Sequence, residues 1–170
     1  EQLLEELHER VLNGIAAVPG EKYRLGWDNL AIWHKIKELS NRFGERGAAL
    51  VVSTYPESFC YQAPDIYGGD RLRRFAATYI GGYINHGLEY RERDLASMVE
   101  KFHLDGFVMH SNRSCRAYSF GQYELARRLE EKHGIPTLML EADMNDTRTW
   151  SDEQANTRID AFLESLDARK

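Results

Sequence analysis

Four short apolar runs, separated by segments with helical periodicity, limit what this chain can fold into. The runs lie at residues 22–27, 48–53, 106–110 and 137–141. The second run, AALVVS, is apolar throughout, which is typical of a strand covered on both faces of a parallel sheet. Strands that alternate with helices favour a layered α/β fold with right-handed crossovers. The sequence therefore predicts a three-layer α/β sandwich, flavodoxin- or Rossmann-like, around a four-stranded parallel sheet.

The segments between the runs predict amphipathic helices, because their apolar residues recur at spacings of three and four. Asp28 and Asn29 are expected to form the turn and cap ahead of the second helix, with Trp33 and Ile36 on its buried face. Ser151 is expected to cap the last helix. The predicted helices are residues 1–17, 30–43, 70–85, 88–103, 122–133 and a final helix after Ser151.

Length and charge narrow the class of protein. The 170 residues suffice for one domain, and the net charge of -5 comes from acidic and basic residues that are interspersed. This pattern indicates neither a nucleic-acid surface nor a membrane anchor. The two cysteines, Cys60 and Cys115, are far apart, so we expect no disulfide framework and a cytoplasmic location.

The first residues already have helical periodicity, with no initiator Met and no capping residue ahead of them. We therefore expect a domain from a longer subunit. In this interpretation residues 1–20 are a helical lead-in from a missing preceding domain, and residues 21–170 form a carboxyl-terminal α/β domain.

Two polar or aromatic features have simple structural explanations. Five arginines on the third and fourth predicted helices are most simply a solvated face, with phosphate or nucleotide binding as the alternative. They are Arg71, Arg73, Arg74, Arg91 and Arg93. The aromatic loop at residues 54–69 follows a strand end, where loops are often functional, but it can equally cover a sheet edge or another domain.

The loop after the third run carries the clearest candidate chemistry. Cys115 follows a strand and precedes a helix, and in an open parallel sheet ligands bind at that edge. Neighbouring guanidinium groups and a helix amino terminus favour the thiolate, which is the form that binds a soft metal or an iron–sulfur cluster. The candidate loop residues around Cys115 are His110, Ser111, Asn112, Arg113, Ser114 and Arg116.

Three interpretations of Cys115 remain open from the residues alone. A free cysteine is often only a small buried hydrophobic residue. A nucleophile assisted by His110 and oriented by Asp143 or Asp146 is a second option, but no oxyanion site is evident. A cluster ligand is the third, and since a 4Fe-4S cluster takes four ligands, the others must come from elsewhere. Asp143, Asp146 and Arg148 follow the last run at the same sheet edge and are further candidates.

The run HSNRSCRAYSFGQYELARRLEEKHGIPTLMLEADMNDTR, with TRIDAFLESL after it, resembles the carboxyl-terminal domain of the benzoyl-CoA reductase and 2-hydroxyacyl-CoA dehydratase family. YRLGWDNLAIW and VVSTYPESF extend the resemblance over residues 23–166. Among members, the chain looks most like the cluster-bearing subunits of the benzoyl-CoA reductase type. A dehydratase subunit is the first alternative, and an iron–sulfur electron-transfer protein of the same superfamily that acts on another molecule is the second.

The resemblance implies a 4Fe-4S cluster held between two α/β domains, with Cys115 as the ligand from this domain and the other cysteines in a missing one. Cys60 matches no ligand position of this subunit type and is therefore interpreted as structural. It also implies a homologous partner subunit and a separate ATP-hydrolysing activator with its own iron–sulfur cluster. The activator would supply one electron at low potential for a CoA thioester substrate, forming a ketyl radical anion before dehydration or ring reduction. The isolated domain would then be inactive by itself.

Overall fold

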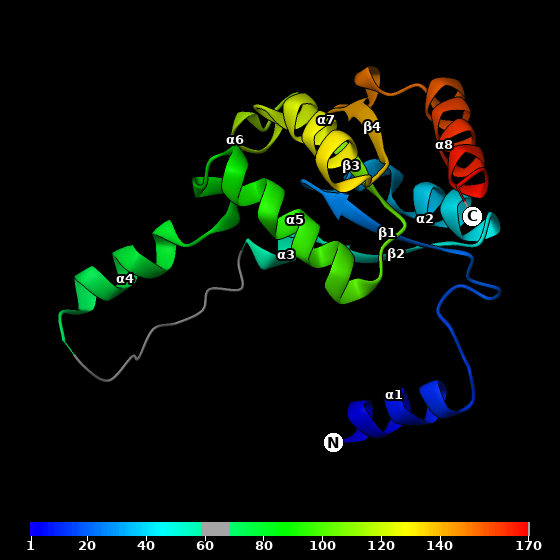
Figure 1. Cartoon of the computed structure of the whole chain (residues 1–170), viewed down its shortest axis with the longest axis horizontal. Coiled ribbons are helices and arrows are strands. Elements are labelled where there is room, and N and C mark those ends of the chain that lie inside the picture. The colour runs from blue at the N-terminus through cyan, green and yellow to red at the C-terminus, as the bar shows by residue number, and fades with distance from the viewer. Residues whose placement is uncertain (59–68, 170) are drawn as a thin grey trace.

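A four-stranded parallel sheet forms the centre of the computed structural model, which describes residues 1–58 and 69–169. The strands are β1 (Tyr23–Asp28), β2 (Ala48–Ser53), β3 (Gly106–Asn112) and β4 (Thr137–Ala142), in the order β2-β1-β3-β4. The predicted α/β fold with parallel strands is therefore confirmed (Figure 1). The aromatic loop that the sequence singles out extends into residues 59–68, and these, with Cys60, lie outside the described part.

Helices cover both faces of the sheet. One core cluster packs α2 (Ile36–Glu45) and α8 (Asp152–Asp167) on one face, and a second packs α5 (Leu88–Phe102) and α7 (Gln122–His133) on the other (Figure 1). The chain leaves β1 toward β2 across the first face and returns to β3 across the second. This reversal places a topological switch point between the carboxyl ends of β1 and β3, the position at which open α/β sheets bind ligands.

The second helix begins later than predicted. Asn29 has a φ of 85°, a left-handed conformation that Asn tolerates, and Ile32 is also non-helical, with a φ of -82° and a ψ of 87°, so helical structure begins only at Trp33. A 3-10 turn, η1 (Trp33–Lys35), precedes α2, so the regular α-helix begins only at Ile36. Trp33 and Ile36 are each 43% exposed, so their predicted burial is wrong.

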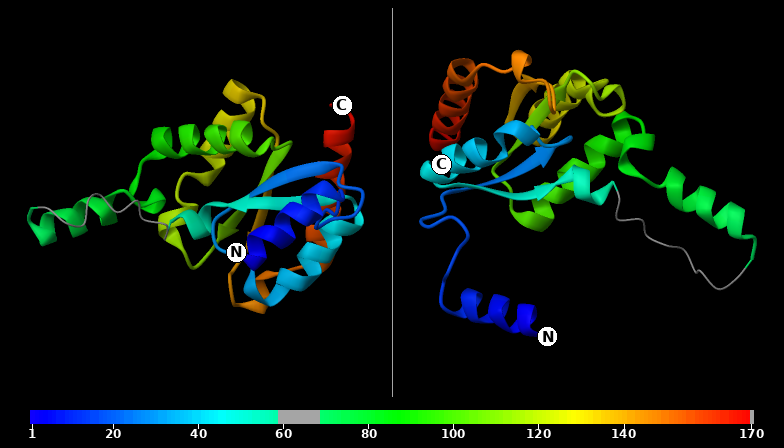
Figure 2. Two further views of the ribbon diagram at one scale, coloured as in Figure 1. Left: turned by 90° about the horizontal axis from the view of Figure 1, so that it is seen from below. Right: turned by 180° about the vertical axis from the view of Figure 1, so that it is seen from behind.

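Two helices stand away from the sheet, as Figure 1 and the right-hand view of Figure 2 show. They are α1 (Gln2–Leu12) and α4 (Arg71–Ile80), and neither has a buried residue. The first ends five residues before the predicted limit, because the chain turns at Gly14 with a φ of 65°. The predicted helix at residues 70–85 stops at Ile80 and is followed by a short turn, η2 (Tyr83–Asn85).

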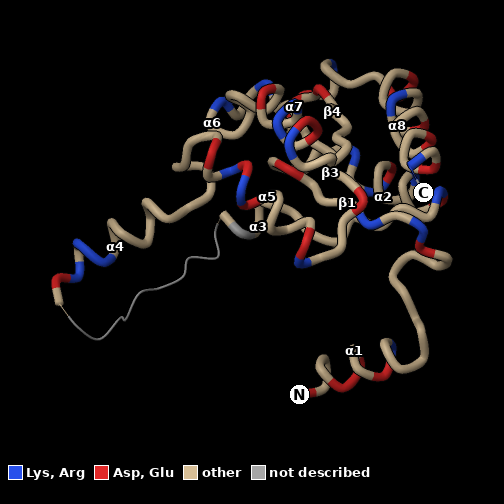
Figure 3. The backbone as a smooth tube through the Cα atoms, viewed as in Figure 1, with Lys and Arg blue, Asp and Glu red and all other residues tan. Residues whose placement is uncertain are grey.

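Acidic and basic residues are interspersed along most of the helices, whereas α1 is mainly acidic and α4 carries arginines without an acidic residue (Figure 3). Within residues 1–58 and 69–169, no helix combines the length and the apolar content that crossing a bilayer requires.

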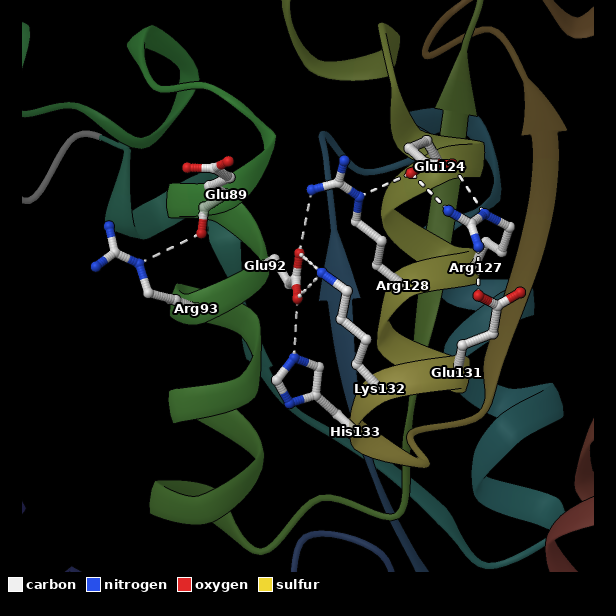
Figure 4. Close-up of polar contacts among 9 residues, drawn as sticks. All are labelled: Glu89, Glu92, Arg93, Glu124, Arg127, Arg128, Glu131, Lys132 and His133. Carbon is white, nitrogen blue, oxygen red and sulfur yellow. Dashed lines mark hydrogen bonds and ion pairs between the residues drawn. The ribbon is translucent and has the colours of Figure 1, made fainter.

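An ion-pair network joins α5 to α7 across the second face (Figure 4). The Glu92 side chain is only 10% exposed, and its carboxylate lies 3.0 Å from Lys132 Nζ, 3.1 Å from His133 Nε2 and 3.3 Å from Arg128 Nη1. The hydrogen bond from Lys132, followed by that from His133, lowers the pKa of Glu92 to about 2. Glu92 therefore fastens the two helices that cover this face.

We expect Glu92→Gln to lower the urea midpoint of unfolding at neutral pH more than Glu131→Gln does. Glu131 is the matched control, because its exposed carboxylate pairs only with Arg127 in the described structure. The folded-state pKa of Glu92 lies below its ordinary value of 4.5, so its contribution is present above about pH 4.5 and is lost as the pH falls toward 2. The difference between wild type and Glu92→Gln should therefore shrink on acidification. Equal midpoints for the two variants would contradict this role.

Candidate functional site

The carboxyl ends of β1 and β3 meet at the switch point, and the predicted cysteine loop lies there. β3 continues to Asn112, two residues beyond its predicted limit. Cys115 follows as the residue before α6 (Arg116–Ser119), a single helical turn that leads to α7. Cys115 is a free cysteine and is partly exposed as a residue, and it lies at the edge of the sheet where the sequence predicts it.

Asn112, the last residue of β3, holds the cysteine loop by hydrogen bonds. Its backbone carbonyl accepts hydrogen bonds from Ser119 Oγ at 2.7 Å and from the Cys115 amide at 3.4 Å. Its side-chain Oδ1 accepts from the Ser114 amide at 3.1 Å. Because Asn112 is itself buried, these bonds tie the exposed turn to the end of a central strand. None of them uses the Cys115 sulfur.

Asp143, at the end of β4, also holds the cysteine loop, through Ser114. Ser114 Oγ donates a hydrogen bond to its Oδ2, and the amides of Asn145 and Asp146 each donate to Oδ1 at 2.9 Å. These bonds, with that from Ser114 the strongest, lower the pKa of the Asp143 carboxyl. Two of the predicted site segments are thus joined by one carboxylate.

The charged candidates lie at the surface of this edge. Arg113 is exposed, with its guanidinium 3.8 Å from the Glu141 carboxylate, and Arg116 is exposed as well. Arg148 pairs with Asp146 at 2.6 Å, and this hydrogen bond lowers the pKa of Asp146 to about 2. Asp146 and Arg148 therefore form a pair of their own on the loop after β4.

His110 is placed differently from the other candidates. It is fully buried, and its Nδ1–H donates to the Leu30 carbonyl oxygen at 2.7 Å. Burial lowers its pKa, so the ring is neutral and Nε2 is a buried acceptor without a hydrogen-bond partner in the described part of the chain. Ser111, the next residue of β3, is partly exposed. His110 is thus part of the buried interior next to the loop, on β3.

A buried polar network that the sequence did not reveal lies beneath the loop. Asp28 is 1% exposed, and its carboxylate accepts from Gln122 Nε2 at 2.6 Å, Thr54 Oγ1 at 2.9 Å and Tyr83 OH at 3.2 Å. Burial raises the pKa of Asp28. Its predicted role as a helix cap is therefore wrong. It joins the ends of β1 and β2 to η2 and α7.

Arg91 also belongs to this buried layer, although the sequence assigned it to a solvated face. It is 6% exposed, and its guanidinium donates to the carbonyl oxygens of Ala117 and Tyr118 in the turn that follows Cys115. The site is thus a partly exposed cysteine on a loop that Asn112, Asp143 and Arg91 hold by hydrogen bonds.

Among residues 1–58 and 69–169, no three His, Cys, Asp or Glu side chains gather into a group able to hold a metal ion. The loop offers one thiol, that of Cys115, as a potential metal ligand. Thiolate is the usual ligand of iron–sulfur clusters, so the chemistry of this side chain is compatible with such a group.

Comparisons with known proteins identify relatives that match nearly the whole chain. Lactoyl-CoA dehydratase subunit alpha of Anaerotignum propionicum is 32% identical over 96% of this chain and 39% of that protein. The (R)-phenyllactyl-CoA dehydratase alpha subunit of Clostridium sporogenes is 31% identical over 99% and 40%, and a benzoyl-CoA reductase subunit of Thauera aromatica is 26% identical over 97% and 40%. The chain spans about 40% of the length of these relatives.

The profile of the 2-hydroxyglutaryl-CoA dehydratase D-component family matches residues 1–166, which include all four strands and the cysteine loop. This match covers nearly the whole chain, and the relatives named above are subunits of acyl-CoA dehydratases and of a reductase. The chain belongs to the 2-hydroxyglutaryl-CoA dehydratase D-component family.

Proposed function

We propose that this chain is part of a subunit of a radical acyl-CoA enzyme and contributes Cys115 as one ligand of a 4Fe-4S cluster. The observation that supports the proposal most directly is the position of Cys115, partly exposed at the switch point, with a loop whose hydrogen bonds leave its sulfur unused. When bound, the cluster would supply one-electron transfer. The remaining ligands would come from outside the described residues.

The residues around Cys115 would orient the ligand and set its surroundings. Asn112 and Asp143 both hold Ser114, the residue before Cys115, which would limit the positions that a bound iron can take. Arg113 and Arg116 add positive charge at the exposed edge, and nearby charge shifts the potential of a cluster. A CoA thioester, with its anionic phosphates, is compatible with the same charge.

Two partners complete the proposal. Several relatives are named as alpha subunits, so we propose a homologous partner subunit for this chain. An ATP-hydrolysing activator with its own iron–sulfur cluster would deliver the electron. These partners follow from the family resemblance.

Replacement of Cys115 tests the ligand role. In the natural full-length chain, purified without oxygen together with its partner subunit, Cys115→Ala should lose part or all of the bound iron and sulfide. The electron paramagnetic resonance spectrum of the reduced cluster should change or disappear. Cys60→Ala is the control and should keep the wild-type spectrum and iron content. A full, unaltered cluster in Cys115→Ala would exclude the proposal.

Two reactions remain as candidates. The first candidate is the benzoyl-CoA reductase type, which rests on the resemblance in overall sequence. Dehydration of a 2-hydroxyacyl-CoA is the second candidate, and the dehydratase alpha subunits among the relatives support it. Incubation of the complex with activator, ATP and separate aromatic and 2-hydroxyacyl CoA thioesters distinguishes the two. Ring-reduced products support the first candidate, and 2-enoyl-CoA products support the second.

A further inference from the structure

Arg91 makes an unusual set of contacts for a buried arginine. It lies on the inward side of α5, and its guanidinium donates to the carbonyl oxygens of Ala117 at 2.7 Å, Tyr118 at 3.1 Å and Ile84 at 3.1 Å. The guanidinium carbon also lies 5.3 Å from the centre of the Tyr83 ring. In the described part of the chain it forms no ion pair with a carboxylate. The charge of Arg91 is therefore directed at backbone carbonyls.

The two carbonyls from Ala117 and Tyr118 belong to α6, the turn that begins immediately after Cys115. A single helical turn is unstable by itself, because forming it fixes several residues for very few hydrogen bonds. In α6 these bonds join the Ser119 amide to the Cys115 carbonyl at 3.1 Å and the Phe120 amide to the Arg116 carbonyl at 3.0 Å. The bonds from Arg91 satisfy the carbonyls that such a turn leaves open.

The Arg91 side chain is held in place by the buried network. Tyr83, which packs against the guanidinium, donates to Asp28 at 3.2 Å, and Asp28 in turn accepts from Gln122 at the start of α7. Arg91 is thus fixed by η2 on one side and by the layer beneath the loop on the other. A rigid donor below α6 limits where the residue that begins this turn can lie.

We propose that Arg91 is a positioning residue for Cys115: it holds the α6 turn so that the sulfur keeps one orientation toward the cluster. The inference rests on the proposed function, because it assigns Arg91 to the same ligand. Loss of the guanidinium should loosen α6 while leaving Cys115 in the chain. The cluster should still bind, but the orientation of its Cys115 ligand should vary more from molecule to molecule.

The test compares Arg91→Gln and Arg91→Lys with Arg93→Gln in the full-length chain, prepared both without and with its cluster. Arg93 is the matched control, because it lies on the same helix, is exposed and contacts only the Glu89 carbonyl in the described structure (Figure 4). Hydrogen exchange without the cluster reports on the amides of Ser119 and Phe120. Exchange there should be on the order of tenfold faster in Arg91→Gln, as expected when charge-assisted hydrogen bonds are lost.

With the cluster bound, Arg91→Gln should keep most of its iron but show a broadened or shifted paramagnetic resonance spectrum and a changed midpoint potential. Arg91→Lys keeps the charge but loses the planar fork that reaches three carbonyls, so it should change both readouts in the same direction. If Arg91→Gln does not fold, Arg91→Lys decides the question by the same measurements.

The outcomes separate this inference from the proposed function. If Arg91 variants match Arg93→Gln in both exchange and spectrum, the inference is wrong. If exchange increases but the spectrum and potential stay as in wild type, Arg91 only stabilises the turn, and the positioning role is also wrong. A Cys115→Ala variant measured in parallel tests the ligand itself, and an unchanged cluster there overturns the proposed function as well.

Discussion

Asp28→Ala is expected to lower the free energy of unfolding by about 3–5 kcal/mol. The substitution leaves Gln122, Thr54 and Tyr83 as buried donors without their acceptor. An unsatisfied buried polar group costs about 1–3 kcal/mol, and several such groups in one network do not add fully. Since a domain of this size is stable by about 5–15 kcal/mol, this variant should unfold at a much lower denaturant concentration.

Asp28→Asn is the matched control, because it keeps the shape of the side chain while it removes the charge and replaces one acceptor oxygen with an NH2 donor. Its Oδ1 can accept from Thr54 and Tyr83, and its amide can donate to Gln122 Oε1, which has no hydrogen-bond partner in the described structure. We expect it to cost less than about 2 kcal/mol. Chemical denaturation of both variants at neutral pH measures the difference. Equal losses would show that the carboxylate network is not what holds these strand ends.

The same pair predicts a pH dependence. Burial raises the folded-state pKa of Asp28 above its ordinary value of 3.8. A raised pKa means that the contribution of this group is fully present below about pH 3.8 and is lost as the pH rises through the folded-state pKa. Asp28→Asn cannot titrate, so its stability relative to wild type should improve as the pH rises above about 4. A constant difference over this range would contradict the pKa shift.

Local patterns in the sequence predict much of the fold. The limits of β2 and α7 agree with prediction, because a continuous apolar run and a clear helical period fix them. Ser151 caps α8 as expected, with its side chain accepting from the Gln154 amide at 3.4 Å. These features depend on residues only a few positions apart.

The Asp28 network depends on residues that are distant in the sequence. Its donors lie 26, 55 and 94 positions away, and no local pattern brings them together. An acidic residue followed by Asn at the end of a strand is equally typical of a helix cap. The network therefore became visible only once the strand order was known.

The burial of Arg91 escapes prediction for a different reason. Charge alone groups it with Arg93, yet it precedes Leu95 by four positions and Met98 by seven. That spacing places it on the buried side of α5, where Leu95 and Met98 also lie. The helical period is thus the signal that separates the buried arginine from its exposed neighbour.

Gly26 shows how the strands beside the candidate site are spaced. A Cβ atom at this position would lie 2.2 Å from Cε1 of Phe107, on the neighbouring strand β3. The Phe107 ring is fully buried between α5 and α7, so it cannot move aside freely. The pairing of β1 with β2 also shifts register at Gly26. The absence of a side chain here lets the two strands that flank the switch point lie at their observed separation.

Gly26→Ala is therefore expected to cost about 2–3 kcal/mol of unfolding free energy, the range for overpacking a tight core. Phe107→Leu should cost about 1–2 kcal/mol in the wild type, but it removes the ring atoms that the new methyl group would meet. The double variant should then be more stable than the sum of the two single losses predicts, by about 1 kcal/mol or more in a double-mutant cycle. Additive losses would show that the cost arises in β1 alone, since the cycle isolates the contact between the two strands.

Strain at Gly26 should also reach the candidate site, because β1 ends at Asp28 and β3 leads into the Cys115 loop. The Ser119 amide should therefore exchange hydrogen faster in Gly26→Ala than in the wild type.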